Sequence, residues 1–145
     1  MTVPTSPATD EPTDAATERV AALFKRLPEL VERDADLVKR GRFLTTEFAI
    51  VVGATPLLVR IETGHVIAVT RGPFLLRSWV FSITAAPETW LKLLKPVPDP
   101  GTHDLMALSK VGLARIEGNL QPFMANLQVI KDILVAPRAL AGNKD

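Results

Sequence analysis

The segment from Trp79 to Leu134 constrains the fold of this chain most strongly. Its order of apolar and polar residues predicts a strand, two short helices, a second strand and a long apolar helix. We expect these elements at 79–84, from Pro87 to about Leu94, after the helix cap Asp104, at 114–117, and from Leu120 to about Val135. Apolar helices placed between and after strands predict a helical layer that covers a sheet.

The preceding segment predicts an antiparallel meander. Residues 44–52 are apolar and rich in β-branched side chains, and the stretches 57–62 and 66–71 alternate in polarity. Thr63 and Gly64, between the last two stretches, predict a tight turn. In the strand that follows at 79–84, Trp79, Phe81 and Ile83 share one face.

The two ends of the chain are expected to lie outside the domain. Residues 1–13 are rich in proline and poor in apolar side chains, which predicts a flexible tail. Asp14 is the expected cap of a first helix with an apolar stripe, and a second helical segment is expected from Pro28 to about Lys39. The length of 145 residues suits one domain, which we place at 14–138, followed by a C-terminal tail at 139–145.

The charges are balanced and dispersed along the chain. Lysine and arginine number 17 and the acidic residues 16, so the net charge of +1 predicts no nucleic-acid partner. The longest apolar run, Phe48 to Ala54, is far shorter than the roughly 20 residues that cross a bilayer, so no integral membrane span is expected. The absence of cysteine excludes disulfides and is compatible with a reducing compartment, which favours a cytoplasmic protein.

The sequence carries no pattern typical of a catalytic or metal site. His65 and His103 lack a second ligand three or four residues away, which argues against a metal. Ser78, Ser82 and Ser109 lie outside any Gly-x-Ser-x-Gly motif, and neither a Gly-x-Gly-x-x-Gly nor a Walker motif is present. We therefore expect no cofactor and no enzymatic activity.

Three segments carry a resemblance to a known family. They are the strand Phe81-Ser-Ile-Thr84, the leucine-rich helix from Glu88 to Leu94, and Gly112-Leu-Ala-Arg-Ile-Glu-Gly118-Asn119 before the last helix. This set is similar to the lipid-binding domain of the sterol carrier protein 2 family, and the resemblance extends from the meander onward. It implies an α/β domain of the α+β type, with a five-stranded, mostly antiparallel sheet covered by helices.

The resemblance also implies a function. In the family, apolar chains lie in a tunnel between the sheet and the helices. This protein is accordingly expected to bind, and to carry or present, a fatty acyl chain, a sterol or a similar lipid, with fatty acids and acyl-coenzyme A among the ligands. The residues that match the tunnel are apolar, and they are Phe81, Ile83, Trp90, Leu94, Leu105, Met106, Leu108, Phe123, Met124, Leu127, Ile130 and Leu134.

Other interpretations of the same residues stay open. Apolar stripes are typical of an ordinary core. They would also suit a non-catalytic interaction subunit that docks on an enzyme of lipid, steroid or isoprenoid metabolism, or on a second copy of the chain as a homodimer. Lys110, Arg115 and Lys131 are placed to meet a carboxylate or a coenzyme A phosphate of a ligand, or to remain solvated surface charges.

Overall fold

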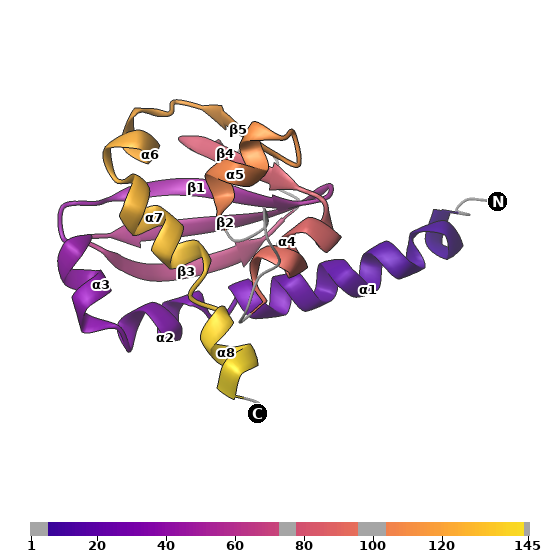
Figure 1. The fold of residues 1–145 in the computed structure, drawn as a ribbon, viewed down its shortest axis with the longest axis horizontal. Helices are drawn as coiled ribbons and strands as arrows, with labels where there is room; N and C mark the ends of the chain where they lie inside the picture. The colour runs from indigo at the N-terminus through magenta and orange to yellow at the C-terminus, as the bar shows by residue number, and fades with distance from the viewer. Residues whose placement is uncertain (1–5, 73–77, 96–103, 144–145) are drawn as a thin grey trace.

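The computed structural model describes residues 6–72, 78–95 and 104–143, so His103 lies outside the described residues (Figure 1). Its centre is a five-stranded sheet of order β3-β2-β1-β4-β5. The strands are β1 (Thr46–Val52), β2 (Thr55–Glu62), β3 (His65–Arg71), β4 (Phe81–Ala85) and β5 (Ala114–Gly118). β1 and β4 are parallel and the other neighbours antiparallel. The predicted five-stranded, mostly antiparallel α+β fold is confirmed.

The meander forms where its alternating pattern predicts it. Phe48 of β1 lies opposite Val59 of β2, which lies opposite Val69 of β3, so apolar side chains meet on one face. Thr63 and Gly64 both have positive φ, at 48° and 88°. Two consecutive residues with positive φ give a hairpin turn whose twist matches that of the strands. The predicted turn is confirmed.

Helices cover the sheet, and Figure 1 shows α4, α5 and α7 lying across the strands. The helices α2, α4 and α6 each carry a proline in the first turn, where a missing backbone N–H costs no helical bond. The helices are α1 (Ser6–Phe24), α2 (Leu27–Glu32), α3 (Ala35–Arg40), α4 (Pro87–Leu93), α5 (Leu105–Lys110), α6 (Gln121–Ala125), α7 (Leu127–Leu134) and α8 (Arg138–Asn143).

Two segments that were predicted as continuous helices are each divided. Pro28 to Lys39 falls into α2 and α3, because the Asp34 carboxylate accepts the backbone N–H of Leu37 at 3.1 Å and starts a new helix. The stretch 120–135 falls into α6 and α7, because the chain leaves helical geometry at Asn126 (φ −125°). The Asn126 amide there donates to the carbonyl oxygen of Pro122 at 3.0 Å. In both places a short polar side chain bonds to a backbone group of the helix.

The ends of the chain are more helical than predicted. α1 begins at Ser6, so the predicted cap at Asp14 is wrong. Pro7 falls in the first turn of α1, where proline is tolerated, and for this reason it does not stop the helix. At the other end, α8 occupies most of the stretch 139–145 that was expected to be a tail.

The inner half of α1 is anchored to the rest of the domain. Val20 and Phe24 are fully buried in the core. Glu18 accepts two hydrogen bonds from Arg71 of β3, at 2.7 and 2.6 Å. These bonds lower the pKa of the Glu18 carboxyl. α1 is thus held both by apolar packing and by an ion pair to the edge of the sheet.

A threonine interrupts the apolar face of β1 and gives a stability prediction. Thr46 is 8% exposed, and its hydroxyl has no hydrogen-bond partner within the described part of the chain. Thr46→Val keeps the shape and removes an unpaired buried hydroxyl, so we expect the free energy of unfolding to rise by about 1 kcal/mol, measured in urea.

The neighbouring threonine provides a matched control. Thr45 Oγ1 accepts the backbone N–H of Thr63 at 3.1 Å. Thr45→Val loses this bond and is expected to lower the free energy of unfolding by about 1 kcal/mol. If Thr46→Val were also less stable than the wild type, the hydroxyl of Thr46 would have a partner and the prediction would fail.

Candidate ligand-binding site

The apolar layer between the sheet and the helices is built on β1 and β4. Phe48 and Phe81 lie opposite each other on these parallel strands, and their rings stack with centroids 4.8 Å apart. Phe123 of α6 meets the Phe81 ring edge-to-face at 5.4 Å. Such pairs contribute about 0.5–1.5 kcal/mol beyond the burial of their area. One aromatic side chain therefore fixes α6 against β4.

The structure brings most of the residues predicted to line a tunnel into this layer. Met106 of α5 and Leu127 of α7 are half-buried against it, whereas Met124 of α6 is 54% exposed. The buried members of the predicted set are Phe81, Ile83, Trp90, Leu94, Leu105, Leu108, Phe123, Ile130 and Leu134.

Trp90 makes specific contacts within the protein. Its indole Nε1 donates to the carbonyl oxygen of Val51 at 3.1 Å, which joins α4 to β1. Its ring meets Phe24 of α1 edge-to-face at 5.4 Å. Because the one polar group of the side chain is satisfied by the backbone, Trp90 has a packing role independent of any ligand.

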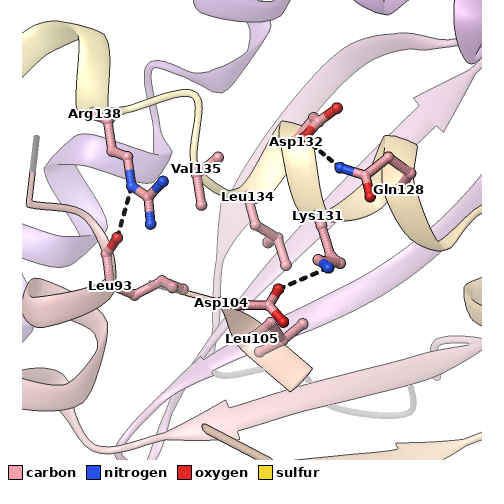
Figure 2. A pocket seen from close by; sticks show the side chains of 9 residues that line it. All are labelled: Leu93, Asp104, Leu105, Gln128, Lys131, Asp132, Leu134, Val135 and Arg138. Carbon is pink, nitrogen blue, oxygen red and sulfur yellow. Dashed lines mark hydrogen bonds and ion pairs between the residues drawn. The ribbon is translucent and has the colours of Figure 1, made fainter. Parts of the chain in front are cut away.

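A pocket of about 370 Å³ opens beside the apolar layer, between α4, α5, α7 and α8 (Figure 2). Its apolar lining is Leu93, Leu105, Leu134 and Val135. Leu93, Leu105 and Leu134 also belong to the buried core, so the pocket borders the apolar layer. Its volume lies within the roughly 300–1,000 Å³ typical of small-molecule sites.

An ion pair crosses this pocket. Lys131 Nζ of α7 lies 2.8 Å from Asp104 Oδ1 at the start of α5 (Figure 2). Asp104 is at the predicted cap position of α5, but its side chain makes no capping bond. Asp104 therefore occupies the predicted N-cap position, but its carboxylate pairs with Lys131 and does not cap the helix. An acidic group of a ligand would have to compete with Asp104 for this ammonium group.

Arg138 closes another side of the pocket. Its Nε donates to the carbonyl oxygen of Leu93 at 2.9 Å, which joins the start of α8 to the end of α4 (Figure 2). Burial lowers the pKa of Arg138, and the nearby Asp104 carboxylate raises it. The guanidinium stays charged at neutral pH, since arginine does not deprotonate in proteins. Lys110 and Arg115, the other cations considered for a ligand head group, are exposed and do not line this pocket.

A second pocket, of about 480 Å³, lies on the other side of the α7–α8 junction and is bounded by α2 and α3. Asp132 and Val135 line both pockets. Arg40 of α3 donates to Asp132 at 2.9 Å. α7 and the residues after it therefore form a wall between two pockets, and an ion pair holds this wall on each side.

Most of the residues around the first pocket were not predicted from the sequence. Leu93, Gln128, Asp132, Val135 and Arg138 were not singled out, although all line it. The spacing of 128, 131, 132 and 135 places these residues on one side of a helix, which was a usable signal. The approach of α4 and α5 to that side depends on the tertiary fold, and no local pattern predicts it.

His65, one of the two histidines considered as metal ligands, pairs with a carboxylate of the protein. His65 Nδ1 lies 2.9 Å from Glu32 Oε1, which joins β3 to α2. No three side chains of the metal-binding types gather within the described ranges. Within those same ranges, the helices are too short or too polar to span a bilayer.

Comparison with known proteins establishes the fold. No family model and no curated protein matches the sequence. Among solved structures, sterol carrier protein 2 is similar with a TM-score of 0.64 at 13% identity, over 81% of this chain and 94% of that chain. A conserved hypothetical protein of Thermus thermophilus, described as possibly a sterol carrier protein, is similar with a TM-score of 0.61 at 14% identity, over 83% and 87%. The chain has the sterol carrier protein 2 fold.

Proposed function

We propose that this protein binds a hydrophobic molecule, such as a fatty acyl chain, a sterol or a similar lipid, between its sheet and its helices, and carries or presents it. The observation that carries the proposal is the pocket between α5 and α7, which shares Leu105 and Leu134 with the buried layer. A ligand that enters there meets apolar side chains from both helices. The sterol carrier protein 2 fold supports the same interpretation.

The free energy of burial favours the binding of an apolar chain with moderate affinity. Each methylene removed from water contributes about 0.8 kcal/mol, so ten contribute about 8 kcal/mol. Association costs roughly 4–15 kcal/mol, and the helices must also separate to make room. Binding therefore depends on how easily the wall of the pocket moves.

α7 is the element whose movement would admit the ligand. Its inner side is apolar, with Ile130, Ile133 and Leu134 buried. The break at Asn126 separates it from α6, so α7 can shift without moving the ring of Phe123. Its outer attachments to α3 and α5 are ion pairs, and pairs of this exposure contribute about 0–1 kcal/mol each. These ion pairs are weak enough for α7 to move away from α3 and α5, and strong enough to affect the rate at which a ligand enters.

Removing the ion pair across the pocket tests this mechanism. Asp104→Asn keeps the size of the side chain and removes the charge that holds Lys131. We expect an acyl chain to bind and dissociate about threefold faster, because up to about 1 kcal/mol of the opening cost is lost. Stopped-flow fluorescence with a fluorescent fatty acid measures both rates.

Glu29→Gln is the matched control. Glu29 pairs with Arg26 at 2.8 Å and with Arg33 at 3.1 Å on the surface of α2. This variant therefore also removes one paired carboxylate charge, but at a site that does not line the pocket. Its rates should equal those of the wild type. Equal rates for Asp104→Asn and the wild type would mean that the pocket between α5 and α7 is not the entrance.

We also propose that the protein is not an enzyme. The carboxylates that line the pocket are held in pairs, Asp104 with Lys131 and Asp132 with Arg40 and Gln128. The described residues that line it include no serine, threonine, cysteine or histidine that could act as a nucleophile or as a neutral base. The remaining alternative is a non-catalytic subunit that docks on an enzyme of lipid, steroid or isoprenoid metabolism. That alternative predicts no ligand of its own.

Native mass spectrometry of the purified protein separates the two proposals. A lipid-binding protein is expected to carry, or to take up from added oleate, a species that is released when the protein is denatured. A folded protein that takes up neither fatty acids nor sterols would refute the proposed function and favour the interaction subunit.

A further inference from the structure

The two edge strands of the sheet, β3 and β5, differ in how regularly they pair with their neighbours. Both edge strands contact a helix, β3 with α2 and β5 with α5, but the pairing of β3 with β2 is interrupted by a register shift between Arg60 and Ile61. β5 at the other edge keeps an unbroken register with β4, from Gly118 opposite Phe81 to Ala114 opposite Ala85 (Figure 1). A regular edge strand offers its free backbone groups to a further strand, whereas a bulge disturbs this pairing. β5 is therefore the edge that can be extended.

The hydrogen-bond pattern of β5 identifies its outward groups. The N–H of Asn119 donates to the carbonyl oxygen of Val80 at 2.9 Å. Because the direction of bonding alternates along an antiparallel ladder, Arg115 and Glu117 bond to β4, and the backbone groups of 114, 116 and 118 are directed away from it. The described residues outside β4 supply no backbone partner for these outward groups. The middle one of the three is Ile116.

The charges on β5 are placed symmetrically about Ile116. Arg115 and Glu117 project from the same face of the strand, with side chains 70% and 59% exposed. If a second copy of β5 pairs antiparallel with Ile116 opposite Ile116, each Arg115 lies opposite the Glu117 of the other copy. Opposite charges directly across a strand pair are stabilising, and like charges are destabilising. The strand is therefore complementary to itself in this register.

Exposed apolar side chains lie at both ends of β5. Val111 and Leu113, which precede the strand, are 67% and 51% exposed, and Met124 of α6, which follows it, is 54% exposed. In an antiparallel pair, the start of one β5 lies beside the end of the other. Val111 and Leu113 of one copy would thus approach Met124 on α6 of the other copy. Burial between two copies would explain why all three apolar side chains are exposed in one chain.

We propose that two copies of this chain pair antiparallel through β5, about a two-fold axis at Ile116, to form one continuous sheet. The two copies of Ile116 exchange backbone hydrogen bonds, and Ala114 of each copy pairs with Gly118 of the other. Arg115 and Glu117 set the register. The proposal does not depend on the binding of a lipid.

Charge reversal on β5 tests the interface. Sedimentation equilibrium is expected to give a mass near twice the 15.8 kDa of one chain. Arg115→Glu places acidic side chains opposite one another at both ends of the pair, and Glu117→Arg does the same with basic ones. Each variant alone should raise the dissociation constant of the dimer about tenfold or more. An equimolar mixture of the two variants should restore the dimer, because every acidic side chain then meets a basic one.

A matched charge reversal on a central strand is the control. Arg60 of β2 lies 3.2 Å from Glu62 in the same strand, as Arg115 does from Glu117 at 3.6 Å, but β2 has a neighbour on each side. Arg60→Glu should leave the dimer unchanged. Urea unfolding of the monomeric variants checks that each remains folded, which is expected because the exchanged side chains are exposed.

Three outcomes would overturn the proposal. The first is a wild-type chain that stays monomeric at about 1 mM, where even a weak pair would form. The second is a dimer that survives each single charge reversal. The third is a mixture of the two variants that stays monomeric. In support of the interface, hydrogen exchange at the amide of Ile116 should slow as the concentration of the wild-type protein increases.

Discussion

Replacing Gly64 by alanine is expected to lower the free energy of unfolding by about 3–5 kcal/mol. Gly64 has φ of 88°, in the region that side chains other than glycine rarely occupy. A Cβ there would lie 2.6 Å from the carbonyl oxygen of Val38 and 2.8 Å from the carbonyl carbon of Gly41. Both are backbone atoms, so the clash cannot be relieved by rotating a side chain. Chemical denaturation followed by circular dichroism measures the loss.

Gly112→Ala separates the clash from the backbone strain. Gly112 has a similar φ of 84°, but a Cβ there would meet no atom within 4 Å. This variant should lose only the cost of a positive φ, about 1–2 kcal/mol. Equal losses for the two variants would show that the turn after β2 is not packed against the end of α3 and the glycine that follows it.

Replacing Val135 by tryptophan is expected to raise the dissociation constant for a fatty acid about tenfold or more. Val135 is half-buried and lines the pocket beside Leu105 and Leu134, so an indole ring there would fill the space through which the ligand enters (Figure 2). The side chain lies outside the fully buried core, so the added bulk can be accommodated with a limited loss of stability. Titration of a fluorescent fatty acid measures the affinity.

Two further variants make this prediction specific. Val111→Trp adds the same bulk at a position that is 67% exposed and outside the pocket, so its affinity should equal that of the wild type. Gln128→Trp obstructs the pocket from its exposed rim and should weaken binding even if Val135→Trp fails to fold. Unchanged affinity in folded Val135→Trp and Gln128→Trp would remove this pocket from the proposed route.

The sequence predicted the parts of the fold that depend on local patterns. Alternation along 57–62 and 66–71, with Thr63 and Gly64 between them, was enough to predict β2, β3 and their turn. Phe81 and Ile83 were expected to share a face and are both fully buried. Burial of one face of a strand specifies its register strongly, which is why these predictions are confirmed.

The failures have two physical causes. The breaks at Asp34 and Asn126 depend on side-chain to backbone bonds that compete closely with a continuing helix, and hydrophobic periodicity does not register them. The pocket depends on segments that are distant in sequence. Asp104 was predicted to cap its own helix, but the fold places Lys131 beside it, and a tertiary ion pair replaced the local role.

Whether the predicted apolar residues act as a binding site or only as a core is the central question about function. Leu105 and Leu134 belong to both the core and the pocket, whereas Trp90 is committed to contacts with Val51 and Phe24. The predicted residues of α5 and α7 are therefore better placed to meet a ligand than Trp90 of α4. This division follows from α7, which carries apolar side chains inward and weak polar attachments outward.

Titration of the isotope-labelled protein with oleate, followed by amide and methyl chemical shifts, tests the central claim most directly. The account predicts that shifts change first around Leu105, Lys131 and Leu134, and then at Ile83 on the sheet side of the apolar layer. Oleate that leaves the spectrum unchanged, or that moves only the opposite face of the sheet around Ser82 and Thr84, would contradict binding between the sheet and the helices.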